Sequence, residues 1–544
     1  MVTVLREGYD FAKFRADALA GLTVAIIALP LSMAIAIACG TTPDRGLYTA
    51  IVGGFLISLL GGSRFQIGGP AAAFIVLIAA TLERHGYDGL VLATMIAGAI
   101  LIAFGLLRIG TYIKYIPHSV IVGFTAGIAV IILTSQLRDL LGLSLASREP
   151  AAFLPKLTAL WEAAPTFNPA AVAVAAGSIA VILLLRRYRP TWPGFLIAVA
   201  LAAVLTAWLG LPVETIGSRF GGVPNTLPAP HIPAISLDRI TLLLPDAFAL
   251  ATLGGIESLL SAVVADGMTG RRHRSNCELV AQGFANVATG LFGGIIATGT
   301  IARTATNIRS GAVGPVAGML HAVFLLAFIL VAAPLASYIP LAALAALLAV
   351  VAANMAERHE FVAILRRSRG GAVVLLATFL VTVFRDLSEG ILVGVVLGSF
   401  LFMHRMAELV SVEGGAPLVD FDQPDSENPR PAYESREGAD EVMVYRIAGP
   451  LFFGASTSVA SALEQIGRLP KVLIFDLSAV PLADTTAASS LRGFVDRARR
   501  HDAEVFIAGA SPRVRRVLVR VGLKPPLVRY APSVADARMG ARYR

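Results

Sequence analysis

A single carboxylate stands inside a long apolar stretch near the middle of the chain. In the sequence LGGIESLLSAVVADG, Leu253 to Gly267, mostly apolar residues surround Glu257 for about two helical turns on each side. A charge in the middle of a membrane costs about 2.5–3.5 kcal/mol on insertion scales, so such residues usually face a water-filled site and carry function. Burial disfavours the charged form of a carboxyl group, and we therefore expect Glu257 to load and release a proton near neutral pH. Helical spacing places Ser261 on the same face.

Two further segments approach a short helix through a glycine-rich stretch. They read GGSRFQIGGPAAAFIVLIAA, from Gly61, and GGIIATGTIARTATNIRSGA, from Gly293. Paired short segments interrupted by Gly or Pro, at corresponding positions in two halves of a chain, indicate the binding site of an inverted-repeat transporter. The alternative is that these glycines only allow helices to pack closely.

The start of each short helix is suited to hold an anion. A helix N-terminus presents unpaired N–H groups and the positive end of the helix dipole. We expect these amides from Ala71, Ala72 and Ala73 in one segment, and from Ile301, Ala302, Arg303 and Thr304 in the other. Arg303 would add a full positive charge if its side chain points inward, and Thr304 and Thr306 would add hydroxyl groups. Alternatively, Arg303 pairs with a carboxylate or a lipid headgroup, or forms a structural salt bridge with Glu257.

The composition places these residues in a membrane. Of the 544 residues, 56% are hydrophobic and only 15% are charged, whereas a soluble domain is about half apolar and a quarter charged. The apolar residues form runs long enough to span a bilayer. Fourteen spans are predicted, near residues 19–39, 45–61, 69–82, 90–107, 116–136, 169–185, 193–210, 243–265, 278–296, 300–312, 315–333, 338–355, 371–384 and 388–407.

The distribution of positive charge predicts the orientation. With fourteen spans both termini lie on one side, and the loops on that side hold 14 Lys and Arg residues against eight in the longer opposite loops. Positive residues accumulate in cytoplasmic loops, so both termini are expected in the cytoplasm. The same rule accounts for the net charge of +9. The sequence contains no basic stripe interleaved with aromatic residues, so we expect no nucleic-acid partner.

The character of the chain changes after His404. We expect a transport domain over residues 1–410, a polar, Pro-rich linker over 411–440, and a small cytoplasmic α/β domain over 441–544, in which apolar strands alternate with amphipathic helices.

Four stretches together resemble the SulP family of anion transporters. They are GLTVAIIALPLSMAIA, ESLLSAVVADGMTGRRHRSNCELVAQGFAN, GTIARTATNIRSGA, and a C-terminal region similar to a STAS domain. The resemblance spans nearly the whole chain. It implies two inverted seven-helix repeats divided into core and gate domains, a homodimer, and an anion held between the two half-helices. It also implies that Glu257 occupies the position whose acidic residue couples cation movement to anion transport.

The chain departs from the family pattern in its first and third spans. Many members have Pro-Gln-x-x-x-Tyr where this sequence has Pro30, Leu31 and Ile35, and a hydroxyl-bearing residue where it has Ala71. We therefore expect a more apolar site that favours a small or partly apolar anion. Ser32 is the remaining polar candidate on the first span, for ligand contact or for helix packing.

The STAS-like domain contains one candidate regulatory turn. In LADTTAASSL, Thr485 or Thr486 matches the residue that is phosphorylated in soluble relatives, although Ala487 replaces the usual Gly. Asp484 is equally suited simply to cap the helix that follows.

Taken together, these features predict proton-coupled symport of a small anion, of the sulfate, bicarbonate or dicarboxylate class, across a bacterial inner membrane. The alternatives are an anion exchanger, a sodium-coupled bicarbonate carrier, an anion channel, and a membrane-anchored signalling protein. The expected partners are the anion, a proton (or sodium) and membrane lipids. The histidines lack metal-ligand spacing, and phosphate-binding loops and nucleophile elbows are missing, so we expect no metal, no cofactor and no enzymatic activity.

Overall fold

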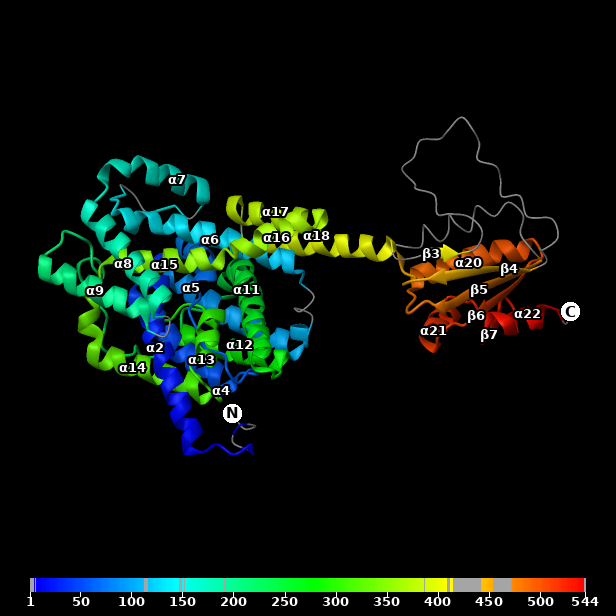
Figure 1. Cartoon of the computed structure of the whole chain (residues 1–544), viewed down its shortest axis with the longest axis horizontal. Helices are drawn as coiled ribbons and strands as arrows, with labels where there is room; N and C mark the ends of the chain where they lie inside the picture. Colours follow the sequence, from blue (N-terminus) through cyan, green and yellow to red (C-terminus); the bar gives the residue numbers. More distant parts are fainter. Residues whose placement is uncertain are drawn as a thin grey trace. The chain divides into compact units, whose positions relative to one another are not determined.

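The computed structural model describes residues 4, 6–111, 116–145, 149–150, 152–189, 192–385, 387–408, 411–413, 442–453 and 471–542. It divides into two compact units, residues 1–398 and 399–544 (Figure 1). The predicted linker, 411–440, lies outside the described residues apart from 411–413, which form a strand.

The first unit is helical, and every one of the fourteen predicted spans has a helical counterpart. Among the described residues, eight helices are at least 18 residues long and apolar enough to cross a membrane. The elements of the first half are α2 (Phe11–Ala38), α3 (Pro43–Tyr48), a π turn (Thr49–Gly53), α4 (Gly54–Leu60), β1 (Gly68–Gly69), the 3-10 turn η2 (Ala72–Phe74), α5 (Ile75–Leu106), α6 (His118–Leu141), α8 (Pro169–Tyr188) and α9 (Gly194–Leu209).

The second half repeats the same kind of succession. It contains α11 (Leu237–Thr269), α12 (Ser275–Leu291), β2 (Thr298–Gly299), α13 (Ile301–Arg309), α14 (Val316–Ala336), α15 (Leu341–Met355), α17 (Arg369–Phe384) and α18 (Leu387–Glu408). Three short helices outside the predicted spans are α7 (Phe153–Glu162), α10 (Ile216–Phe220) and α16 (Arg358–Arg367).

The third and fourth predicted spans are joined at one residue. Helix α5 contains a non-helical residue, Gly86, with φ 69° and ψ −176°. The left-handed φ favours glycine, so the chain turns there between the two spans without a longer loop.

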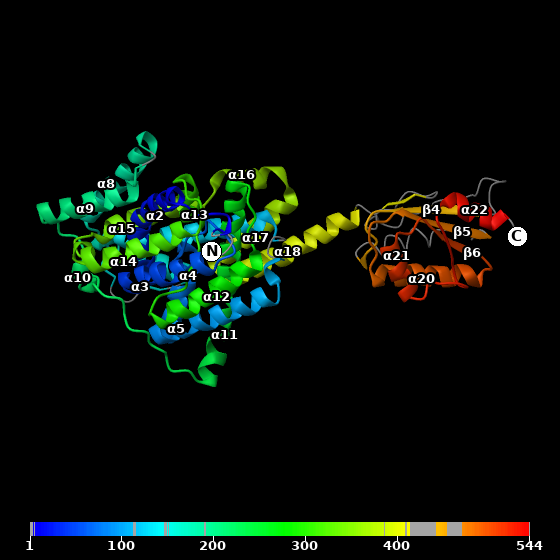
Figure 2. The same cartoon turned by 90° about the horizontal axis from the view of Figure 1, so that it is seen from below.

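Glycine contacts hold together the helices behind the site. α5, α11 and α12 lie side by side (Figures 1 and 2). A Cβ atom added at Gly98 of α5 would lie 2.7 Å from the carbonyl oxygen of Gly283 of α12, and one at Gly283 would lie 2.5 Å from that of Gly98. The two backbones approach this closely because neither residue has a side chain.

The second unit is a small α/β domain with its own hydrophobic core. Its sheet has the order β3 (Ser411–Glu413), β4 (Val442–Ala448), β5 (Val472–Ala479), β6 (Glu504–Ala508) and β7 (Arg529–Ala531). β3 is antiparallel to β4, and the remaining pairs are parallel. The helices are α20 (Thr485–Arg500), α21 (Pro512–Arg520) and α22 (Val534–Arg542). Side chains of α20 and α21 belong to the larger core cluster, whereas Ala537 of α22 belongs to a separate one.

Candidate functional site

The two glycine-rich approaches meet in a short antiparallel ladder. Gly68 pairs with Gly299, and Gly69 pairs with Thr298. Each strand is followed almost at once by a helix, η2 and then α5 on one side and α13 on the other. Two segments more than 200 residues apart in the chain therefore start their helices next to each other, as the sequence predicted.

Both helices begin without a side-chain cap. Ala71, at the cap position of η2, has no side chain that could accept a bond from the first-turn amides, and Thr300 at the cap of α13 makes no such bond. The Oγ1 atom of Thr300 is buried and has no hydrogen-bond partner. The first N–H groups of a helix have no partner inside the helix, so each start presents free donors and a positive dipole end.

These two helix starts open into one cavity of about 420 Å³. Ala71, Ala72 and Ala73 line it from one side, and Ala302 and Arg303 from the other. Glu257 of α11 faces the same cavity. Further lining residues were not assigned by sequence analysis. They include Thr300, Thr125 of α6, Phe195 of α9, Asn354 and Met355 of α15, and Glu357. Leu31 and Ile35, predicted to make the site apolar, also line it.

Arg303 is buried, with 2% of its surface exposed, yet it is only partly bonded. Its Nη2 atom donates to Ser32 Oγ and to the carbonyl oxygen of Pro70, both at 3.2 Å, while Nε and Nη1 have no partner. A Cβ atom at Gly69 would collide with Nη1, so glycine is needed there to admit the guanidinium group. Arg303 thus supplies a full positive charge with unused donors at the cavity.

Glu257 also keeps an unused atom at the site. Its Oε2 atom is buried and has no hydrogen-bond partner. Within the described part of the chain, no salt bridge joins Glu257 to Arg303, whose only bonded nitrogen contacts Ser32 and Pro70. A carboxyl oxygen held in this way can take up a proton without first breaking an ion pair.

Three of the residues predicted to bind substrate lie behind the cavity. Ser261 donates to Thr304 Oγ1 at 3.1 Å, and Thr304 Oγ1 accepts from the backbone N–H of Ile67, also at 3.1 Å. Ser32 is fully buried and accepts from Arg303. None of these three is among the residues that line the cavity. They tie α11, α13, α2 and the first approach to one another.

A second buried acid, which sequence analysis did not single out, anchors the first approach. Glu278 is fully buried and accepts from the backbone N–H groups of Gly62 at 2.7 Å and Ser63 at 3.1 Å. Gln282 donates to its other oxygen at 3.0 Å, and Ser258 does so at 3.4 Å. Every partner is a donor, so hydrogen bonds rather than an ion pair satisfy both oxygens of the buried Glu278 carboxyl group.

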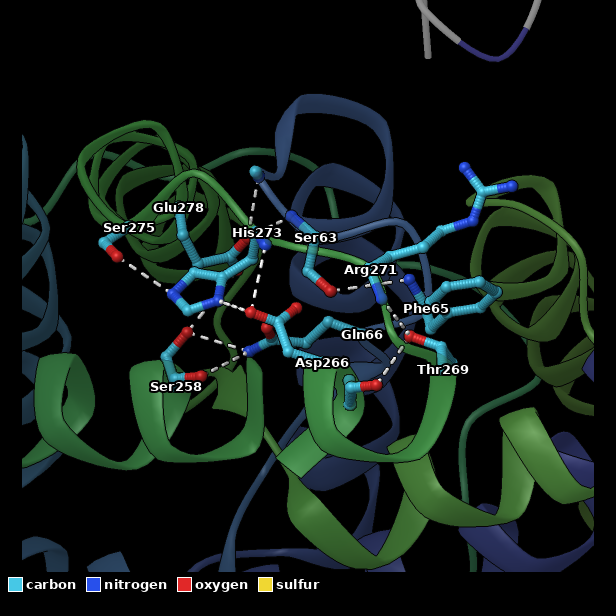
Figure 3. A network of polar contacts seen from close by, with 12 residues as sticks. Ser63, Phe65, Gln66, Ser258, Asp266, Thr269, Arg271, His273, Ser275 and Glu278 are labelled. Carbon is cyan, nitrogen blue, oxygen red and sulfur yellow. Dashed lines mark hydrogen bonds and ion pairs between the residues drawn. The ribbon is translucent and has the colours of Figure 1, made fainter. Parts of the chain in front are cut away.

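The same network reaches the strand ladder. Gln66 Nε2 donates to Ser258 Oγ at 2.8 Å, and a Cβ atom at Gly299 would collide with the Gln66 side chain. Figure 3 shows Gln66, Ser258 and Glu278 converging from three segments, beside His273, which contacts Asp266 at 2.7 Å. Ser258 therefore links the helix that carries Glu257 to β1. One sign of the Glu278 network was present in the sequence, namely an acidic residue in the first turn of the predicted helix.

In the α/β unit, Asp484 caps α20 as expected from its type. Its Oδ1 atom accepts from the N–H of Ala487 at 2.8 Å, and its Oδ2 atom from the N–H of Phe453, also at 2.8 Å. Thr485 and Thr486 are exposed in the first turn of α20.

Two family models match the chain. The sulfate permease family matches residues 14–378, and the STAS domain matches residues 433–537. The chain is 41% identical over 520 residues to "Putative sulfate transporter YvdB" of Bacillus subtilis, which covers 95% of both chains. It is 32% identical over 527 residues to bicarbonate transporter BicA of Picosynechococcus, covering 94% of this chain and 92% of that one.

Two solved structures are similar in fold. The murine Solute Carrier 26 family member A9 anion transporter in the inward-facing state has a TM-score of 0.86 at 20% identity, covering 100% of this chain and 94% of that one. The transmembrane domain of a cyanobacterial bicarbonate transporter, BicA, has a TM-score of 0.63 at 32% identity, covering 71% of this chain and 98% of that one. The chain therefore resembles known transporters in the arrangement of its helices as well as in sequence.

Proposed function

The chain belongs to the sulfate permease family and is an anion transporter rather than an enzyme, and we propose that it takes up a small anion together with a proton. The observation that carries this proposal is a pair of incompletely bonded charged groups, Glu257 and Arg303, that face one cavity between two uncapped helix starts. A fully paired Arg and Glu would have argued for a structural role instead.

The electrostatics of the cavity explain how the proton and the anion depend on each other. With Glu257 neutral, the cavity holds the Arg303 charge and two positive helix ends, which together favour an anion. Once Glu257 loses its proton, its negative charge opposes the bound anion at short range. Loading of the proton therefore strengthens anion binding, and its release weakens it.

The position of the cavity fits uptake towards the cytoplasm. We assign α6 and α15 to the gate. Their contributions to the cavity wall come from the first half of α6 and from the last turn of α15, and both of these ends are predicted to be cytoplasmic. In the proposed cycle the half-helices move with their anion past the gate-side helices, around a site near the middle of the membrane.

The walls of the cavity bear on the choice of anion. Relatives are named for sulfate and for bicarbonate. In this chain Leu31, Ile35 and Phe124 are among the residues that line the cavity, and apolar side chains cannot replace the water molecules that an anion loses on binding. We propose a small, weakly hydrated anion as the preferred substrate.

The test is isotope uptake into proteoliposomes with and without an inward proton gradient. For wild type, the gradient is expected to increase the accumulation of one anion in a panel of bicarbonate, sulfate, nitrate and dicarboxylates. Glu257→Gln should abolish that stimulation but keep residual exchange, because Gln cannot release a proton. Glu83→Gln, an exposed residue away from the cavity, is the matched control. Stimulation that survives in Glu257→Gln would overturn the proposed coupling.

The same vesicles separate the alternatives. A sodium gradient or an opposing anion that replaces the proton gradient would identify a sodium-coupled carrier or an exchanger. Single-channel conductance would identify a channel, and the absence of any flux a signalling protein.

The setting of the protein is also part of the proposal. We place it in a bacterial inner membrane with both termini in the cytoplasm, as a homodimer. Its STAS domain would be open to regulation at Thr485 or Thr486, which are exposed. Cysteine accessibility at the two termini, cross-linking in membranes and phosphosite mapping test these three points.

A further inference from the structure

A third charged residue, Glu357, lines the cavity at its rim. It lies in the connection between α15, which ends at Met355, and α16, which begins at Arg358. Glu357 is among the cavity-lining residues, and so are Asn354 and Met355 just before it. Glu257 and Arg303 are largely enclosed, but Glu357 is exposed. An exposed residue that also lines the cavity stands where the cavity opens.

The backbone at this residue is unusual for glutamate. Glu357 has φ 38° and ψ 49°, in the left-handed region. That region favours Gly, Asn and Asp, and a longer side chain adopts it at a cost. The residue precedes α16 at its cap position, yet its side chain makes no capping bond. Neither the turn nor the cap therefore explains a glutamate at this position.

In the part of the chain that the structure describes, the Glu357 carboxylate has no direct ionic partner, although it stands at the positive N-terminal end of α16. Among the described residues it takes part in no hydrogen bond or salt bridge, whereas Glu360, one turn further on, lies 3.8 Å from His118. Arg186 is near the same rim, but its Nη1 atom donates to Asn354 Oδ1 at 2.7 Å. Arg358 is exposed in the first turn of α16. The C-terminal end of α15, whose dipole is negative, faces the same opening.

We propose that Glu357 is a specificity-determining residue that makes this opening select anions by their charge. The inference rests on the proposed anion transport. An ion that enters or leaves through the rim must pass a fixed negative charge, and the Coulomb energy of that encounter is twice as large for a dianion as for a monoanion. Arg303 also attracts a dianion twice as strongly as a monoanion, but it does so at the bound site deeper in the cavity, whereas Glu357 acts on the ion as it passes the rim. Glu357 thus favours monovalent over divalent anions.

The test compares two substitutions that fit the same backbone. Glu357→Asp keeps the charge and Glu357→Asn removes it, and both residues tolerate the left-handed conformation. The readout is the ratio of the sulfate concentration to the nitrate concentration that halves uptake of the transported anion. This ratio should fall about fivefold in Glu357→Asn and stay within about twofold of wild type in Glu357→Asp, as expected for one unit charge at moderate effective dielectric.

Two controls sharpen the result. Glu360→Gln removes a neighbouring charge that does not line the cavity and should leave the ratio unchanged. The effect of Glu357→Asn should shrink in high salt, because exposed charges are screened. Equal ratios in the Asp and Asn variants would overturn the inference. Uptake that does not depend on the proton gradient would contradict the coupling through Glu257. The comparison of Glu357→Asp with Glu357→Asn would still decide the role of Glu357.

Discussion

Arg303 is positioned by two neighbours with little or no side chain, Gly69 and Ser32. Gly69 has no side chain, and Ser32 is small enough to accept a bond from the Nη2 atom without blocking the cavity. The Nε and Nη1 atoms stay free because no further acceptor approaches them. A charged group that costs several kcal/mol to bury is thus left with unused donors where an anion would supply the missing partner.

We expect Gly69→Ala to impair transport in two ways, by displacing Arg303 and by straining the backbone, because Gly69 has a φ of 157°. The new methyl group would collide with Nη1 and force the guanidinium group away from its bonds to Ser32 and Pro70. Displacing a cation that contacts the ion should raise the KM for the anion about tenfold or more, which corresponds to roughly 1.4 kcal/mol. Initial uptake rates over a range of anion concentrations measure it.

Gly267→Ala is the matched control for this change. A Cβ atom at Gly267 would have nothing within 4 Å, so KM should not change. If Gly69→Ala left KM at the wild-type value, the position of the guanidinium group beside Gly69 would not decide the affinity for the anion.

The sequence identified some residues of the site but not others, for physical reasons. Glu257 and Arg303 stand out because charges are rare in apolar segments. Ser261 follows Glu257 by four residues, which is about 40° beyond a full helical turn. That rotation is enough to direct its side chain to Thr304 rather than to the cavity. Glu357 lies in a connection, where no periodic pattern indicates what a side chain faces.

At the scale of elements, the two interrupted segments depend on the helices packed behind them. α5 and α12 approach each other through Gly98 and Gly283, and α12 carries Glu278, which holds the loop that leads to β1. The apolar runs predicted where these helices would lie. They could not predict which faces meet, because in an apolar segment almost every face is suited to lipid or to protein. The short helices α7 and α16 escaped prediction because neither is an apolar run.

Gly283→Ala should destabilise the membrane unit. The added methyl group would lie 2.5 Å from the carbonyl oxygen of Gly98, so the two helices must separate. Overpacking of this kind typically costs about 1–3 kcal/mol, and we expect a lower thermal unfolding temperature for the purified protein in detergent.

Gly177→Ala provides the comparison. Gly177 lies in α8, and a Cβ atom there would have nothing within 4 Å. Its unfolding temperature should equal or slightly exceed that of wild type, since alanine favours a helix. Equal unfolding temperatures in the two variants would show that the α5–α12 contact at Gly283 does not decide the stability.

At the scale of the whole molecule, the transport site belongs to one unit only. All residues that line the cavity lie between Val24 and Ile391, and the α/β unit has separate core clusters of its own. Alternating strands and helices predicted that second domain. They did not predict that 411–413, at the start of the expected linker, would form the antiparallel edge strand β3, because three residues are too few to show a pattern.

Truncation after Glu413 should therefore leave the affinity for the anion intact. We expect its KM to stay within about twofold of the full chain, since an affinity change of less than about 0.4 kcal/mol is expected when no contact to the ion is removed. Uptake rates that are normalised to the amount of protein in the vesicles provide the measurement. A large rise in KM would mean that the STAS domain acts on the site itself.

The ladder between Gly68–Gly69 and Thr298–Gly299 has a mechanical consequence. Backbone pairing joins the approaches to the two helix starts, so we expect the two starts to move together and to keep their spacing when the protein changes conformation. On this view the anion is not released by separation of the two helix starts. In the proposed cycle it would travel with both helix starts and leave when Glu257 loses its proton or when water enters from the cavity wall.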